Sequence, residues 1–189
     1  MSLLETTVRS KIIVHADTPY TGATYYDLAA VLADATLFGA VIDDIASQIP
    51  QTARLVIAPE ASGFMWGASV AARSGRAFLP LRKSGCIFGR KISITGCHPF
   101  RRNREFTYEL SETPLLNHRR VAIVDDIIFS GRTVASLVET LRSQQITVEV
   151  VACVLGFPAV FAASMSTPVY CVVSLESCNQ DLTGPDSTR

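Results

Sequence analysis

The sequence predicts an α/β protein with a doubly wound, mostly parallel sheet flanked by helices. Short apolar runs of strand length alternate with segments of helical periodicity, and polar residues gather where several of these runs end. Such alternation is typical of crossover connections between parallel strands. The 189 residues suit one domain. A chain of this length can bury a core without disulfide or metal support.

The first half of the chain supplies part of this sheet. Residues 7–15 alternate roughly in polarity and predict an edge strand. Apolar residues at helical spacing predict a helix over residues 36–49, and Pro50 ends it. The next predicted elements are a strand at 54–59, a helix at 63–73 and a strand at 77–81.

The second half begins with a long polar segment. Residues 84–105 are rich in Gly, Lys, Arg and Pro, with a possible strand at 91–95. A segment of this length with little regular structure is typical of a functional lid or of disorder, and we interpret it as a lid. The later elements are strands at 106–110, 121–124, 148–155 and 169–175, with a helix directly after Thr133.

Composition narrows the possible partners and the compartment. The formal net charge is zero, so we expect neither nucleic acid nor a membrane surface as partner. Five cysteines without CxxC spacing favour reduced thiols in a cytoplasmic protein. Residues 150–163 are apolar but are interrupted by Gly156 and Pro158, which favours a core strand and a loop over a membrane span. The 48% hydrophobic content predicts an exposed apolar patch that a homodimer would cover.

The strongest functional signal is the run VAIVDDIIFSGRT. Its apolar start predicts a buried strand that carries Asp125 and Asp126 at its C-terminal end, before a polar turn opens a helix. Ligands of open α/β sheets bind at that edge, and a helix N-terminus attracts anions. Gly131 permits close approach of the backbone, and the Ser130 and Thr133 hydroxyls add donors. Because paired carboxylates can accept hydrogen bonds from two neighbouring hydroxyls, this run suits a sugar phosphate.

Two further strand ends carry groups that suit phosphate. Where the strand at 54–59 leads into a helix, Ser62 and Gly63 fit a small anion-binding turn. Arg82 and Lys83 follow the next strand and can neutralise a diphosphate. Together with the strand that carries Asp125 and Asp126, three strand ends have such groups, which favours a common phosphate site.

Each feature also has a plainer interpretation. The two acids can be solvated, with Ser130 serving as an ordinary helix cap. Glu60 and Ser62 can be the capping groups of a helix entry. Arg82 and Lys83 can form a solvated basic turn.

The run VAIVDDIIFSGRT resembles the 5-phosphoribosyl 1-diphosphate (PRPP) motif of type I phosphoribosyltransferases, in which four apolar residues precede two acids and a Ser/Thr-Gly-x-Thr turn. Residues 56–83 and 22–27 look like the purine group of that family, the adenine phosphoribosyltransferase-like members. The resemblance implies the type I fold as a single domain over residues 1–189. It also implies a small hood subdomain built from residues 1–30 and part of 156–189.

The implied activity is transfer of the 5-phosphoribosyl group from PRPP to a nitrogenous base, with a purine favoured, in nucleotide salvage. Diphosphate is released, and Mg²⁺ is required. No protein side chain is assigned directly to the metal, because Mg²⁺ would be bound mainly through PRPP and water.

The resemblance also implies the site residues. The acids would hold the ribose hydroxyls, and a lid carboxylate is a proton-transfer candidate, which gives the catalytic set Asp125, Asp126 and Glu105. The PRPP-binding set adds the residues after the acids: Ile127, Ile128, Phe129, Ser130, Gly131, Arg132 and Thr133. The diphosphate-binding set joins the second strand end, the basic pair and the lid arginines: Pro59, Glu60, Ala61, Ser62, Arg82, Lys83, Arg101, Arg102 and Arg104.

Two departures from the purine group's pattern bear on the activity. Ser62 stands where adenine enzymes have Arg in Glu-Ala-Arg-Gly-Phe, and residues 101–105 read Arg-Arg-Asn-Arg-Glu where those enzymes have Glu-Tyr-Gly. Two alternatives therefore stay open: a regulatory protein of the same fold that senses PRPP or nucleotides, and a transferase for an unusual acceptor. The lack of a basic surplus argues against nucleic-acid binding.

Overall fold

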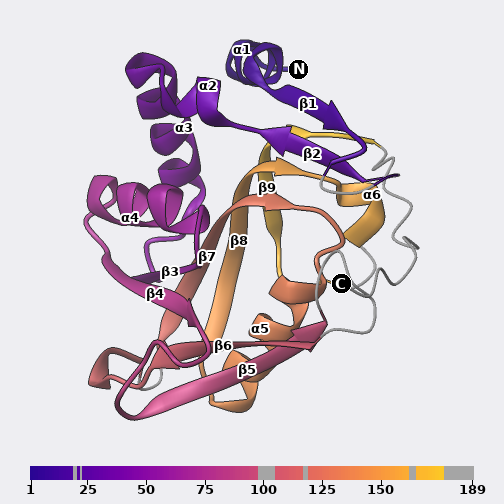
Figure 1. Cartoon of the computed structure of the whole chain (residues 1–189). Helices are drawn as coiled ribbons and strands as arrows, with labels where there is room; N and C mark the ends of the chain where they lie inside the picture. The colour runs from indigo at the N-terminus through magenta and orange to yellow at the C-terminus, as the bar shows by residue number, and fades with distance from the viewer. Residues whose placement is uncertain (19–20, 22, 98–104, 117–118, 162–164, 177–189) are drawn as a thin grey trace.

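The computed structural model describes residues 1–18, 21, 23–97, 105–116, 119–161 and 165–176 (Figure 1). The description that follows applies to these residues.

A mixed seven-stranded sheet forms the centre of the molecule, in the order β5-β6-β4-β3-β7-β8-β9 (Figure 1). Its strands are β3 (Leu55–Pro59), β4 (Ala77–Lys83), β5 (Lys91–Cys97), β6 (Glu105–Ser111), β7 (Arg120–Ile128), β8 (Thr147–Gly156) and β9 (Val169–Ser174). Strands β4, β3, β7, β8 and β9 are parallel to one another. Strands β6 and β5 extend the sheet at the β4 edge with antiparallel pairs. The C-terminal ends of the parallel strands therefore meet at one edge of the sheet.

Helices cover both faces of this sheet. They are α2 (Ala29–Leu32), α3 (Ala35–Gln48), α4 (Gly63–Arg73), α5 (Arg132–Ser143) and α6 (Pro158–Phe161), with a 3₁₀ turn η1 (Pro114–Leu116). On one face, Ile45 of α3 and Trp66 of α4 belong to a buried apolar cluster. On the other face, Leu137 and Leu141 of α5 belong to a second cluster. The predicted doubly wound α/β fold is thus confirmed.

The N-terminal region differs from the prediction. It contains helix α1 (Leu3–Lys11) and a separate two-stranded antiparallel sheet of β1 (Ile13–Ala16) and β2 (Thr24–Asp27). The predicted strand over residues 7–15 is therefore wrong for its first part, because residues 7–11 are helical. The Ser2 side chain accepts a hydrogen bond from the Glu5 backbone N–H at 3.0 Å and starts this helix. Helix α1 packs against β9.

Two other predicted boundaries change in ways that matter for the site. Strand β7 continues through both acids to Ile128, so Asp125 and Asp126 lie within the strand and not just beyond it. The predicted lid over residues 84–105 contains β5, which pairs along its whole length with β6. The possible strand at 91–95 is thus confirmed as β5, and these residues belong to the sheet and not to a lid. Residues 84–90 connect β4 to β5, and residues 98–104 lie outside the described residues.

Candidate active site

The acid pair lies near the C-terminal end of β7, where it meets the start of α4. Both side chains are partly buried. The Asp125 carboxylate accepts a hydrogen bond from the Asp126 backbone N–H at 2.9 Å, and the Asp126 carboxylate accepts one from Ile127 N–H at 2.8 Å. A Cβ atom on Gly63 would lie 2.8 Å from Asp125 Oδ1, so the glycine lets α4 begin directly against this carboxylate.

The electrostatic setting of Asp125 is unfavourable to its charge. Burial raises the pKa of Asp125 well above its ordinary value, and the neighbouring charge of Asp126 raises it further. In the described part of the chain, no Lys or Arg forms an ion pair with either acid. The interpretation of this pair as simply solvated acids does not fit Asp125. The pair is better suited to hydroxyl donors or to a cation brought by a ligand.

The turn after β7 leads into α5 through a left-handed residue. Gly131 has φ +68° and is the N-cap residue of α5, with no side-chain cap among the described residues. A Cβ atom at this position would lie 2.6 Å from Phe161 Cβ, so only glycine fits between the turn and α6. Ser130 therefore does not cap the helix. Ser130 and Thr133 are partly buried, while Arg132 is exposed.

The residues between the acids and the turn pack into the core. Ile128 is buried, and Ile127 packs against the cluster on the α3 and α4 face. Phe129 stacks on Phe157 at a ring-centroid distance of 5.4 Å and lies 5.9 Å from the ring of Tyr26 in β2. Any contact of these three residues with PRPP would thus be through the backbone, and their side chains fix the position of the turn against the N-terminal hairpin.

The residues directly after β3 form a loop that hydrogen bonds hold against β4. Pro59 is buried at the end of β3, and the Glu60–Ala61 peptide bond is cis. Glu60 Oε2 accepts hydrogen bonds from Arg82 Nε at 2.9 Å and from the Lys83 backbone N–H at 3.0 Å. These two hydrogen bonds, that from Lys83 first, lower the pKa of Glu60.

The helix-cap interpretation of this loop is not supported. Ser62 is the N-cap residue of α4 but makes no side-chain cap hydrogen bond among the described residues, and Glu60 bonds to β4. Arg82 is held by Glu60, and the Lys83 side chain is exposed beside it. The structure thus brings Pro59, Glu60, Ala61, Ser62, Arg82 and Lys83 together at one end of β3 and β4.

The structure adds to the site two residues of β6 that were not predicted from the sequence. The Tyr108 hydroxyl donates to the Glu60 carbonyl oxygen at 3.3 Å. Burial raises the pKa of Tyr108 to about 12, with further contributions from the charges of Asp125, Glu60 and Asp126. Tyr108 therefore lies within electrostatic reach of both strand ends. No local signal marks it, because its position depends on the antiparallel pairing of β6 with β4.

Glu109 is the second of these residues. It is 3% exposed and accepts hydrogen bonds from Lys91 Nζ at 2.7 Å, Ser84 Oγ at 3.2 Å and Ile87 N–H at 3.3 Å. Glu109 thus anchors the β4–β5 connection directly after Lys83.

The lid residues are only partly placed. Arg101, Arg102 and Arg104 lie outside the described residues. Glu105 begins β6, with its backbone paired with Cys97 of β5. The assignment of the arginines to diphosphate and of Glu105 to proton transfer stays a prediction.

Comparison with known proteins identifies the family. Residues 30–176 match the phosphoribosyl transferase domain family. The adenine phosphoribosyltransferase of Alkaliphilus metalliredigens is 33% identical over 150 residues, which cover 74% of this chain and 82% of the relative. That of Novosphingobium aromaticivorans is 35% identical over 127 residues, covering 67% and 70%. This chain belongs to the phosphoribosyltransferase family. These relatives place it in the purine group.

Solved structures confirm the type I phosphoribosyltransferase fold. Adenine phosphoribosyltransferase of Thermoanaerobacter pseudethanolicus superposes with a TM-score of 0.82 at 24% identity, covering 90% of this chain and 99% of the other. The Saccharomyces cerevisiae enzyme, complexed with adenine and an imino-altritol bisphosphate, gives a TM-score of 0.80 at 19% identity, covering 92% and 100%.

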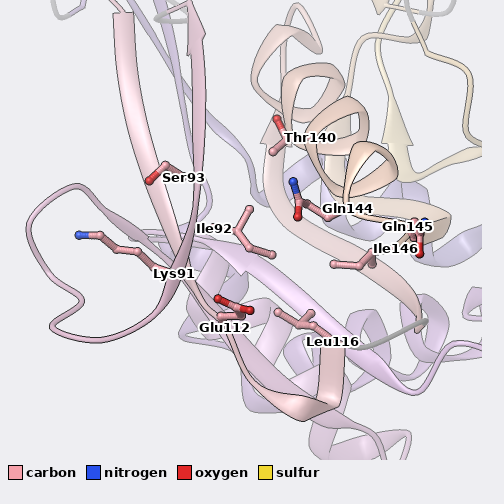
Figure 2. A pocket seen from close by; sticks show the side chains of 9 residues that line it. All are labelled: Lys91, Ile92, Ser93, Glu112, Leu116, Thr140, Gln144, Gln145 and Ile146. Carbon is pink, nitrogen blue, oxygen red and sulfur yellow. The ribbon is translucent and has the colours of Figure 1, made fainter.

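A separate pocket of this phosphoribosyltransferase is lined by residues of β5, η1 and α5 (Figure 2). It has a volume of about 400 Å³ and lies between β5 and the C-terminal end of α5, with Ile92, Leu116 and Ile146 among its lining residues. The predicted PRPP turn is at the other end of α5, about 12 Å along the helix axis from Thr140, the pocket residue of α5 that lies nearest to it in the sequence. The pocket is therefore not part of the candidate site.

Proposed function

We propose that this phosphoribosyltransferase transfers the 5-phosphoribosyl group of PRPP to a purine base and releases diphosphate. The observation that carries the proposal is the acid pair of β7 beside the turn at Gly131, which opens α5. Two carboxylates and a helix N-terminus that, within the described residues, has no side-chain cap suit the two ends of a ribose 5-phosphate. The loop tied by Glu60 lies next to them and suits the diphosphate.

In the proposed reaction, a ring nitrogen of the base attacks the anomeric carbon of PRPP. The bond from that carbon to the diphosphate oxygen breaks, and positive charge builds on the sugar. Asp125 and Asp126 accept hydrogen bonds from the ribose hydroxyls, and their charge favours the cationic transition state. Lys83 and Arg82 oppose the charge that develops on the leaving diphosphate.

The described residues fit a Mg²⁺ requirement. Within them, no three His, Cys, Asp or Glu side chains group as a metal-binding cluster. Mg²⁺ would be bound mainly through PRPP and water, because it keeps several waters and takes its other ligands from substrate phosphates. The bound ion would neutralise charge on the diphosphate, while Asp125 and Asp126 bond to the ribose hydroxyls.

The acceptor is proposed to be a purine, with adenine favoured by the names of the relatives. A homodimer and a cytoplasmic location also remain proposals. Exposed apolar side chains of the N-terminal hairpin, Ile13, Val14 and Tyr25, offer a surface that a second copy could cover. None of the described helices has the length and apolar composition needed to span a bilayer.

A base panel tests this proposal. The purified protein is incubated with PRPP, Mg²⁺ and one of adenine, hypoxanthine, guanine, uracil or orotate, while diphosphate release and PRPP binding are measured. We expect release with a purine. Tight PRPP binding without turnover on any base would support the PRPP-sensing alternative, turnover with a pyrimidine alone would refute the acceptor class, and absence of PRPP binding would refute the site.

A charge variant tests the diphosphate side separately. Lys83→Ala should raise the PRPP dissociation constant roughly tenfold, as for loss of one charge-assisted contact, and should change nucleotide binding less. Arg54→Ala is the matched control, because it removes an exposed cation just before β3, at the other end of that strand. Equal losses of PRPP and nucleotide binding in Lys83→Ala would contradict the assigned role.

A further inference from the structure

Two cysteines face each other across neighbouring strands of the sheet. Cys153 of β8 and Cys171 of β9 are paired in register, and both thiols are free. The Cys153 thiol donates a hydrogen bond to Cys171 Sγ at 3.4 Å. Cys153 is buried and Cys171 is partly exposed. Cys171 is therefore the residue of the pair that retains contact with solvent.

The geometry permits a bond between the two sulfurs. Neighbouring strands lie about 4.8 Å apart, which falls within the Cα separation of about 4.4–6.8 Å found for disulfides. The sulfurs lie 3.4 Å apart, so they would have to approach by about 1.4 Å to reach the S–S bond length of about 2.05 Å. Gly156 provides the space, because a Cβ there would lie 2.3 Å from Cys171 Sγ and 3.2 Å from Cys153 Sγ.

The cysteine pair is joined directly to the acid pair. Cys153 pairs in register with Asp125 across β7 and β8, so the three residues form one row across three strands. Gly156 pairs with Ile128, and Phe157 N–H donates to the Ile128 carbonyl oxygen at 3.2 Å. A change in the spacing of β8 and β9 at this row would thus be transmitted to the end of β7, which carries the acids and the turn.

We propose that Cys153 and Cys171 form a peroxide-sensitive dithiol, and that its conversion to a disulfide weakens PRPP binding by shifting Asp125. The first part stands on the geometry of the two thiols, and the second rests on the proposed function of the acid pair.

The oxidation balances with hydrogen peroxide as the two-electron oxidant. The Cys171 thiolate attacks one peroxide oxygen, the O–O bond breaks, and the products are a Cys171 sulfenic acid and hydroxide. The Cys153 thiol then attacks the sulfenic sulfur, the S–O bond breaks, and the disulfide forms with loss of water. Cys171 suits the first step, because the hydrogen bond from Cys153 lowers the pKa of Cys171 while burial raises that of Cys153.

Disulfide formation is tested by mass spectrometry on peptides of the peroxide-treated full chain. The background variant Cys86→Ser removes a thiol that is exposed and outside the pair. We expect a peptide cross-linked between Cys153 and Cys171, reversed by dithiothreitol, and its loss in both Cys171→Ser and Cys153→Ala. Absence of this cross-link in folded protein would overturn the proposal.

The coupling to the site is tested by two measurements on reduced and oxidised protein. Hydrogen exchange at backbone amides of residues 125–131 should differ between the two forms, and the PRPP dissociation constant should rise about fivefold or more on oxidation. Cys171→Ser should show neither change after peroxide. Equal exchange in the two forms would overturn the coupling. If the reduced protein fails to bind PRPP, the proposed function fails, and hydrogen exchange alone still decides the coupling.

Discussion

The acidic residues at the two strand ends of the candidate site have pKa values shifted in opposite directions. Glu60 is held by Arg82 and by the Lys83 N–H, and these hydrogen bonds lower its pKa. Asp125 sits beside a second carboxylate with its pKa raised, chiefly by burial. The charges of the Glu60 loop are thus paired without a ligand, whereas the acid pair lacks a counter-charge within the described residues.

This difference indicates that the Glu60 loop contributes to stability, whereas the acid pair is suited to binding a ligand. The Glu60 loop is a scaffold whose charges satisfy one another. The acid pair carries an electrostatic cost in the free protein, which hydroxyl donors or a cation would relieve on binding. Functional sites commonly keep such destabilised groups, because a group that is already satisfied has less to gain from a ligand.

The largest effect is expected from neutralising both acids. Asp125→Asn with Asp126→Asn should raise the PRPP dissociation constant by about a hundredfold or more, since each charge-assisted hydrogen bond contributes about 1.5–3 kcal/mol. The fold should persist, as followed by circular dichroism, and calorimetry measures the affinity. Unchanged PRPP affinity in a folded double variant would contradict the ribose assignment.

A smaller loss is expected when Asp125 is displaced and its charge is kept. In Gly63→Ala the new Cβ would lie 2.8 Å from Asp125 Oδ1, so the carboxylate has to move. We expect about a tenfold loss of PRPP affinity, in the range of one charged hydrogen bond.

Gly39→Ala is the matched control for this substitution. It lies in α3, where an added Cβ meets nothing within 4 Å. It should leave PRPP affinity unchanged and stabilise the helix by up to about 1 kcal/mol. An equal loss of affinity in both variants would refute the role of the contact between Gly63 and Asp125.

Much of this arrangement could be predicted because its signals are local. Helix α4 was predicted at residues 63–73 and lies at Gly63–Arg73, since a regular apolar period and Gly75 fix its extent. The acid pair and its turn follow from one contiguous run. The helix at residues 7–11 was missed although Ser2 and Glu5 have capping-box spacing, because the rough alternation in polarity suggested a strand.

The remaining features depend on contacts between distant segments. Tyr108 and Glu109 join the site only because β6 turns back along β4, and a one-residue shift in that register would point each to the opposite face. The ion pair of Glu60 with Arg82 also depends on strand pairing. The opposite pKa shifts of Glu60, just after β3, and Asp125, in the neighbouring strand β7, therefore could not be predicted from residue type.

A smaller effect is expected on the pH dependence of folding stability, which should distinguish Asp125 from Glu60. Because the folded-state pKa of Asp125 is raised, its contribution to stability is full below the ordinary value and is lost as pH rises through the raised one. Asp125→Asn should therefore be more stable than wild type at neutral pH, on the order of 1 kcal/mol. The difference should disappear as pH falls.

Glu60→Gln should show the opposite sign at neutral pH. The folded-state pKa of Glu60 is lowered, so its contribution is present above the ordinary value and is lost as pH falls through the lowered one. The variant should be less stable than wild type at neutral pH and should converge with it in acid. Denaturant unfolding across a pH series measures both variants, and differences of the same sign at neutral pH would refute the contrast between the two strand ends.

The smallest effect is expected at Tyr108, whose hydroxyl bonds to Glu60 and lies within electrostatic reach of the acid pair. Tyr108→Phe removes the hydrogen bond to the Glu60 carbonyl oxygen and keeps the ring, so PRPP affinity should fall roughly threefold, near the low end for a neutral hydrogen bond. Tyr170→Phe is the matched control, because it removes a hydroxyl that bonds to Asp44 of α3. The control should lower the unfolding temperature without changing PRPP affinity. If the two variants lose affinity equally, or if Tyr108→Phe binds PRPP as wild type does, then the hydrogen bond from Tyr108 to Glu60 does not contribute to PRPP binding.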